Sequence, residues 1–216
     1  MTGDFLFIHN MRVYTGENKM WTSRILGVEM YHLIGYFIIY SILGWFAESV
    51  YMSFCNKKVT NRGFVTSPFC PIYGFGGLGC VLILSQLSNH PIRLYIAGAV
   101  LATTFEFLVA KLMLKIFGEV WWDYHDKPYN YQGIVCLEST VAWGFYAVFI
   151  VKFLNHYILK RMNELSMESG IFLIRIVLVV VSIDFMIHLL IALGINIRVY
   201  RDRVLEKYDN FKARWY

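Results

Sequence analysis

The stretch IRLYIAGAVLATTFEFLVAKLMLKIF, residues 92–117, is apolar over most of its length and carries one carboxylate, Glu106, in its interior. At about 1.5 Å per residue, a helix of this length exceeds the ~30 Å hydrocarbon core of a bilayer. Four more stretches have comparable apolar character: residues 31–54, 69–87, 134–158 and 171–195. The sequence therefore predicts an all-α, polytopic integral membrane helical bundle of about five transmembrane helices.

The composition agrees with a membrane protein. Hydrophobic residues make up 57% of the 216 residues and charged residues only 16%, whereas soluble domains average about 25% charged residues. Five spans of about 20 residues use roughly half of the chain. They leave no room in these residues for a separate soluble catalytic domain.

The second apolar stretch differs from the others in its glycine content. It holds Gly74, Gly76, Gly77 and Gly79 shortly after Pro71, so a broken or partly re-entrant element is an alternative to a plain helix here. The glycines match the G-x-G-x-x-G pattern, but no βαβ unit surrounds them, so a dinucleotide site is rejected in favour of close helix packing. No Walker A motif occurs either, and no cofactor is expected.

The two ends of the chain differ from the central bundle, residues 30–195. Residues 1–29 are polar and without sustained period, which indicates a disordered or surface-lying N-terminal extension, or a misassigned start with Met30 as the natural first residue. Residues 196–216 carry apolar side chains three or four positions apart with basic residues between them. This pattern predicts an amphipathic basic helix on an anionic leaflet, with a partner-binding helix as the alternative and no nucleic acid partner.

Lysine and arginine residues predict the orientation. They are concentrated in the connection 55–68 and in the tail, with Lys127 in the connection 118–133, and the positive-inside rule assigns that face to the cytoplasm. We therefore expect a multi-pass protein of the cell membrane with its N-terminus outside and its C-terminus cytoplasmic.

Polar residues collect where the spans meet this cytoplasmic face. Glu48 lies about two turns before the end of the first span, and Arg62 is the nearest cation in sequence that can pair with it. That pair is equally consistent with a structural ion pair and with a functional role. Asp123, Asn130 and Glu138 follow beside an interfacial Trp121-Trp122 pair. Together these residues predict a polar vestibule.

Glu106 and the pair Asp184 and His188 are the polar residues inside spans that most need partners. Glu106 sits roughly 15 to 18 Å inside its span, where a proton, a cation or a water-filled cavity must satisfy it, and a functional or bundle-fixing role is favoured. Asp184 and His188 are one helical turn apart. They predict an interhelix clamp, with a proton relay as the alternative.

No metal site is expected. The four cysteines, Cys55, Cys70, Cys80 and Cys136, form no C-x-x-C pair. Asp123, His125 and Cys136 could bind a metal only if folding brought them together.

These stretches resemble a family of small bacterial integral membrane proteins labelled ABC transporter permeases of the CmpB type. The resemblance runs from about residue 34 to 150, and it rests on Gly44, Trp45, Glu48, Asn61, Arg62, Gly63, Phe64, Pro68, Cys70, Pro71, Tyr73, Gly74, Glu106, Trp121, Trp122, Asp123, Tyr124, Asn130, Gly133, Cys136 and Leu137. Where the family pattern reads Gly-Arg-Ile-Cys-Leu, this chain has Gly133-Ile134-Val135-Cys136-Leu137. The role of that arginine is therefore absent or filled by Arg62.

Three functions compete at this stage. The first is a transporter permease component with a polar site at the cytoplasmic face, which would need a homo-oligomer or a separate ATPase subunit. The second is an intramembrane enzyme acting on a lipid or lipid-linked substrate, with Glu48 or Asp123 as general base and Arg62 holding an anionic head group. The third is a membrane scaffold or sensor protein.

Overall fold

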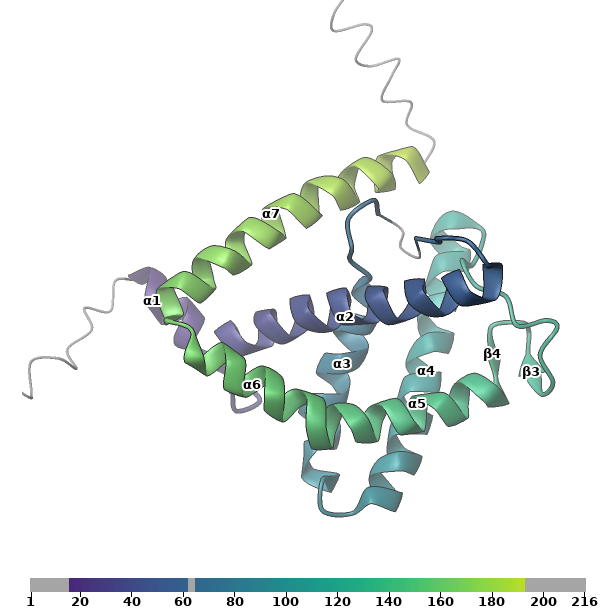
Figure 1. Cartoon of the computed structure of the whole chain (residues 1–216), viewed down its shortest axis with the longest axis horizontal. Helices are drawn as coiled ribbons and strands as arrows, with labels where there is room; N and C mark the ends of the chain where they lie inside the picture. Colours follow the sequence, from purple (N-terminus) through teal and green to yellow (C-terminus); the bar gives the residue numbers. More distant parts are fainter. Residues whose placement is uncertain (1–15, 62–64, 193–216) are drawn as a thin grey trace, which may run out of the picture.

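The computed structural model describes residues 16–61 and 65–192, and its architecture is helical (Figure 1). The helices of the bundle are α2 (Met30–Asn56), α3 (Pro71–Leu84), the short 3₁₀ helix η2 (Ser85–Leu87), α4 (Pro91–Phe117), α5 (Leu137–Phe149), the π-helical turn η3 (Ile150–Leu154), α6 (Asn155–Glu164) and α7 (Met167–Ala192). Together, α5, η3 and α6 form one continuous rod, Leu137–Glu164.

Four of these elements are long and apolar enough to cross a membrane: α2, α4, the α5–α6 rod and α7. The remaining predicted span, residues 69–87, corresponds to α3 and η2. Together these two helices rise about 27 Å, a little less than the thickness of a hydrocarbon core. The prediction of a membrane helical bundle is confirmed. The count of five spans depends on this shorter helix.

Local backbone chemistry sets several helix ends. Pro71 and Pro91 begin α3 and α4, because proline has no N–H to lose at the first helical position and its φ suits a helix. The left-handed residues Lys57 and Gly118 end α2 and α4. The Gly118 N–H donates to Leu114 O at 3.1 Å, which closes the last turn of α4.

Helix α3 packs against α2 through two of its four glycines. A Cβ atom on Gly77 would lie 2.5 Å from the Tyr40 ring, and one on Gly74 would lie 2.2 Å from Ser41 Oγ. Gly76 and Gly79 have open space instead. Close packing, as the sequence indicated, explains Gly74 and Gly77, and α3 runs through all four positions without a break.

Helices α4 and α5 pack through small residues as well. A Cβ on Gly98 would lie 2.2 Å from Ala147 Cβ, and Thr103 Oγ1 donates to Thr140 Oγ1 at 3.0 Å. Small residues let two helix backbones approach closely in a membrane. This contact brings the middle of α4 to the first turns of α5.

Figure 1 shows α3 and α4 running across the direction of α2 and the α5–α6 rod, while α7 extends away from the rest of the bundle. The segment before α3 contacts the C-terminal half of α7. Ser67 N donates to Asp184 Oδ2 at 2.7 Å, and Thr66 Oγ1 lies 3.3 Å from His188 Nε2. These contacts clamp α7 to the connection before α3, in which Thr66 and Ser67 lie outside any helix.

Part of the N-terminal extension is folded. Residues 16–29 include α1 (Gly16–Thr22) and the strands β1 (Arg24–Ile25) and β2 (Val28–Glu29). Trp21 is only 3% exposed and belongs to the same apolar core as Tyr31 and Ile174. Residues 1–15 and the tail from 193 onward, including the predicted amphipathic helix, lie outside the described residues.

The outer surface of the bundle is apolar. Exposed large side chains along α4 and α7 include Ile92, Ile96, Val100, Leu108, Phe172, Ile176, Val179, Val180 and Ile183. An apolar surface of this extent is unfavourable in water and suited to lipid. The exposed side chains are therefore those expected of a helical bundle surrounded by lipid.

Candidate functional site

Glu106 is enclosed between spans. Its side chain is 5% exposed, and three side chains donate to its carboxylate: Trp143 Nε1 at 2.9 Å, Tyr124 OH at 3.1 Å and Ser139 Oγ at 3.5 Å. Within the described ranges these hydrogen-bond donors are all neutral. A buried carboxylate needs such partners because an unsatisfied one is very costly in a low-dielectric interior.

Two of the donors are positioned by the start of α5. Cys136 is the N-cap of this helix and forms a capping box with Ser139, in which Ser139 N donates to the Cys136 sulfur at 3.3 Å. Ser139 and Trp143 are four residues apart and therefore share one helical face. The capping box orients that face toward Glu106, which gives Cys136 a structural role beside the site.

The third donor comes from the loop between α4 and α5. Tyr124 N donates to Gly133 O at 2.9 Å, which holds the tyrosine against the other arm of the loop. Burial, together with the nearby Glu106 carboxylate, raises the pKa of Tyr124. The hydroxyl therefore keeps its proton at physiological pH and acts as a donor.

A second carboxylate lies near this group. Glu48 on α2 is partly buried and forms a hydrogen bond with the Tyr73 side chain, and its charge acts on Glu106. Tyr73 stands over Gly44, where a Cβ would lie 2.2 Å from the ring. The Tyr73 ring also lies 6.1 Å from the Trp143 ring, centroid to centroid. The structure thus joins Glu48, Tyr73, Glu106 and Tyr124 in one polar and aromatic cluster.

The predicted Glu48–Arg62 pair cannot be followed, because Arg62 and Gly63 lie outside the described residues. Asn61, directly before them, accepts a hydrogen bond from Trp45 Nε1 at 2.6 Å. It also donates to Thr66 O at 3.5 Å. Asn61 thus ties the connection back to the middle of α2, where Trp45 lies.

Asn130 and Gly133 shape the loop between α4 and α5. This loop contains the paired strands β3 (Asn130–Tyr131) and β4 (Val135–Cys136). Asn130 Nδ2 donates to Lys127 O at 2.9 Å and to His125 O at 3.1 Å, and its Oδ1 accepts from Gly133 N at 3.0 Å. Gly133 has φ +65°, a conformation that favours glycine. Both residues act on the backbone of the loop.

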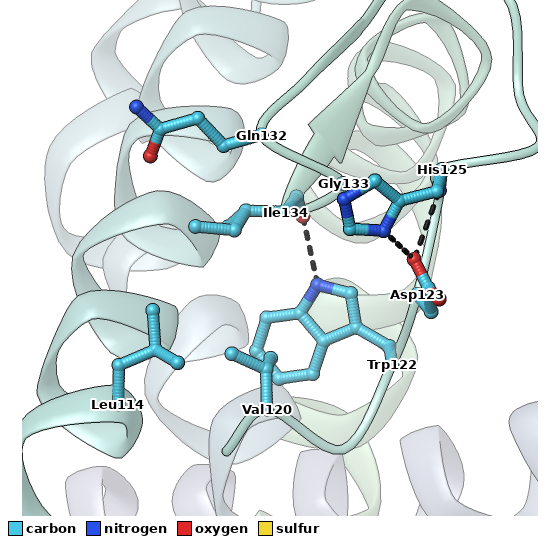
Figure 2. Close-up of a pocket in the computed structure, with 8 residues that line it drawn as sticks. All are labelled: Leu114, Val120, Trp122, Asp123, His125, Gln132, Gly133 and Ile134. Atoms are coloured by element: carbon cyan, nitrogen blue, oxygen red, sulfur yellow. Dashed lines mark hydrogen bonds and ion pairs between the residues drawn. The ribbon is translucent and has the colours of Figure 1, made fainter. Parts of the chain in front are cut away.

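The Asp123 side chain is exposed, with 72% of its surface accessible. It accepts hydrogen bonds from the His125 backbone N–H, at 2.9 Å, and from the His125 ring Nδ1. These bonds, the backbone one first, lower the pKa of Asp123. Asp123 and His125 line a cavity of about 320 Å³ together with Leu114, Val120, Trp122, Gln132, Gly133 and Ile134. Figure 2 shows the pair on one side of the Trp122 ring and Leu114 on the other.

Glu138 forms an exposed ion pair with Lys127, at 2.9 Å. The carboxylate of Glu138 raises the pKa of Lys127. An ion pair this exposed contributes little to stability because water and salt screen it. The contact holds the loop against the first turn of α5.

The candidate site residues within the described ranges therefore fall into two groups. Glu48 and Glu106 lie in the enclosed cluster, whereas Asp123 and Glu138 lie on the outer side of the loop and Asn130 supports its backbone. Sequence reasoning missed Ser139 and Trp143. Their four-residue spacing, on a span next to one with a buried acid, was the available signal.

No group of three or more histidine, cysteine, aspartate or glutamate side chains within residues 16–61 and 65–192 is arranged to hold a metal ion. Cys136 is engaged at the start of α5, and Asp123 bonds His125. The enclosed cluster is chemically suited to hold one charge, or one proton, inside the bundle.

A polytopic helical membrane protein with a carboxylate enclosed between two of its long helices is the class that this fold and site define. The family model described as "Putative ABC-transporter type IV" matches residues 35–189, and the chain belongs to this family. The match confirms the resemblance to the CmpB type and extends it over most of α7. No curated protein and no solved structure matched the chain.

Proposed function

We propose that this protein is the membrane-embedded component of a transporter, in which Glu106 and its donors form a polar site for the solute that opens to the cytoplasmic face. The observation that carries the proposal is the enclosure of Glu106, at 5% exposure, by Tyr124, Ser139 and Trp143. Ionisable residues inside membrane helices are costly and typically belong to solute or proton pathways.

The chemistry of the donors supports a site that changes its charge. Three neutral donors stabilise an ionised Glu106 without cancelling its charge. A second carboxyl group, Glu48, lies in the same cluster, and two neighbouring carboxyl groups disfavour simultaneous ionisation. A carboxyl group held between these effects can release or take up a proton, or bind a cationic group, as its surroundings change.

Energy and partners come from outside these spans in this proposal. The sequence has no Walker A motif, and family membership supports a separate ATPase subunit. The spans of one chain are too few to enclose a path for the solute. In this proposal a second copy of the chain completes that path. The basic tail would lie on anionic lipid at the cytoplasmic face.

The test is untargeted metabolite and lipid profiling of cells and medium, with wild-type protein, Glu106→Gln and Glu119→Gln. Glu119 lies just beyond α4 and is exposed, so its change removes the same charge without touching the enclosed cluster. We expect a solute whose distribution between cells and medium depends on wild-type protein. Glu106→Gln should abolish that dependence, and Glu119→Gln should keep it.

Insertion of all three proteins is checked first by membrane fractionation. An unchanged solute distribution with Glu106→Gln would contradict the proposal. A lipid that is chemically altered, and lost in an Asp123→Asn strain, would favour the enzyme alternative. If only truncation of the tail had an effect, the scaffold or sensor alternative would be favoured.

A further inference from the structure

We propose that the cavity beside Trp122 binds a primary ammonium group, with the amine head group of a membrane lipid as the expected source. The residues that line this cavity include neither Tyr124 nor Glu106. This site does not depend on the transport proposal.

The cavity is built from an apolar wall and a polar edge. Leu114, Val120 and Ile134 provide the apolar wall, and the volume of about 320 Å³ is at the small end for ligand sites. The Trp122 ring is held in place because its Nε1 donates to Ile134 O at 2.8 Å. A small head group fits this space, and the tryptophan is already oriented to receive it (Figure 2).

The polar edge presents hydrogen-bond acceptors. In the tautomer in which His125 Nδ1 donates to Asp123, the other ring nitrogen, Nε2, is an acceptor. The Asp123 carboxylate is an acceptor as well. A ligand must therefore bring donors, which an ammonium group does and a phosphate or carboxylate does not.

Both hydrogen bonds from His125 go to Oδ1 of Asp123, which leaves Oδ2 for a ligand. The lysines near the loop have other partners, since Lys127 pairs with Glu138 at 2.9 Å and Lys111 donates to Gln132 at 2.6 Å. The low pKa of Asp123 keeps the carboxylate ionised at neutral pH. A carboxylate beside a tryptophan ring combines ionic and cation–π attraction for an ammonium group.

The position of the cavity favours a lipid over a free solute. Helix α4 ends at Phe117, and Trp121 and Trp122 follow after three residues. Tryptophans next to the end of a span lie at head-group depth in a bilayer. The apolar wall then faces the glycerol region, and Asp123 faces the head group.

The experiment measures lipid binding to the purified full-length protein by native mass spectrometry. The probes are a short-chain phosphatidylethanolamine, a phosphatidylglycerol with the same acyl chains, and free ethanolamine. We expect the ethanolamine lipid to bind more tightly than the glycerol lipid. Asp123→Asn should weaken that binding about tenfold or more, because it removes a charge-assisted hydrogen bond.

The matched control is Asp126→Asn. Asp126 is an exposed carboxylate of the same loop that does not line the cavity, so binding should stay within about twofold of wild type. Asp123→Glu, which keeps the charge, should restore part of the affinity. If free ethanolamine competes as well as the lipid does, the ammonium site stands and its source is a soluble amine.

Three results would overturn the proposal. The first is equal binding of the ethanolamine and glycerol lipids to wild-type protein. The second is unchanged binding of the ethanolamine lipid by a folded, monodisperse Asp123→Asn protein. The third is an equal loss with Asp126→Asn, which would reduce the effect to the general charge of the loop.

Discussion

At the scale of single residues, the donors around Glu106 decide whether a carboxyl group can remain inside the bundle. Trp143 makes the shortest of the three hydrogen bonds, at 2.9 Å, and it lies one helix away from the acid. Tyr124 reaches the other carboxylate oxygen from a loop. The site is therefore a tertiary feature, held by side chains of two different elements.

We predict that Trp143→Phe lowers the free energy of unfolding by about 1–3 kcal/mol, because it keeps an aromatic ring but leaves one oxygen of a buried carboxylate without its best donor. The measurement is denaturant unfolding in detergent micelles. In a Glu106→Leu background the same change should cost clearly less, since no carboxylate remains to be satisfied. Equal costs in the two backgrounds would show that the hydrogen bond contributes nothing.

Gly133 and Gly118 allow a second comparison between residues. Both have positive φ, +65° and +77°, but a Cβ on Gly133 would lie 2.2 Å from the His125 ring, whereas Gly118 has open space. Alanine at either position lowers the free energy of unfolding by about 1–2 kcal/mol, because a side chain is strained in the left-handed backbone conformation. Gly133→Ala must also displace the His125 ring, so we predict a larger loss of stability than for Gly118→Ala.

The readout is again unfolding in micelles, with ethanolamine-lipid binding as a second measurement. Displacement of His125 should weaken that binding in Gly133→Ala but not in Gly118→Ala. Equal loss of stability in the two variants would argue against the described seating of the His125 ring.

At the scale of elements, the contact between α2 and α3 rests on which glycine faces which helix. Gly77 faces the Tyr40 ring, and Gly76, its neighbour, has open space. Neighbouring residues on a helix point about 100° apart, so one side can be packed while the next is open. The four glycines of α3 therefore do not serve one purpose.

We predict opposite effects of alanine at these two positions. Gly77→Ala should destabilise the protein by about 1–3 kcal/mol through overpacking against Tyr40. Gly76→Ala should be neutral or stabilising by up to about 1 kcal/mol, because alanine favours the helix. Thermal unfolding of both variants in the same detergent tests the pair. Similar destabilisation at both positions would contradict the described face of α3.

At the scale of the whole molecule, the positions of the connections between helices determine which ends of the spans share one membrane face. The connections before α3 and after α4 lie at the same end of the α3–α4 pair, and the turn between η2 and α4 lies at the other end (Figure 1). This arrangement is compatible with α3 and α4 as an antiparallel pair across the bilayer. The charge distribution then predicts which end is cytoplasmic.

We predict that single cysteines at Ser88 and Ser166 react with a membrane-impermeant reagent added outside intact cells, and that cysteines at Thr60 and Asp126 do not. The native cysteines are replaced first, and permeabilised cells serve as the labelling control. The reverse pattern would invert the orientation. Protection of both Ser88 and Thr60 positions would mean that α3 and η2 do not cross the membrane.

Much of the bundle follows from local sequence. The predicted spans 31–54 and 92–117 end within two residues of α2 and α4, because apolar length, prolines and left-handed caps act within a few residues. The need of Glu106 for partners was equally predictable, since it follows from burial alone. The glycines of α3 were compatible with a broken or re-entrant element, but α3 runs unbroken through Gly74 and Gly77, which let it pack against α2.

Two features depended on tertiary structure: which side chains bond Glu106, and which side chains of the loop between α4 and α5 point to Glu106 or line the cavity. Tyr124 points inward to Glu106 while Asp123 and His125, its direct neighbours, line the outer cavity. Ser139 and Trp143 reach the acid only because α4 and α5 pack closely through Gly98 and Ala147. Apolar periodicity and charge counts describe one segment at a time. The direction of a loop side chain and the approach of two helices are set by contacts between segments, and those contacts exist only in the folded chain.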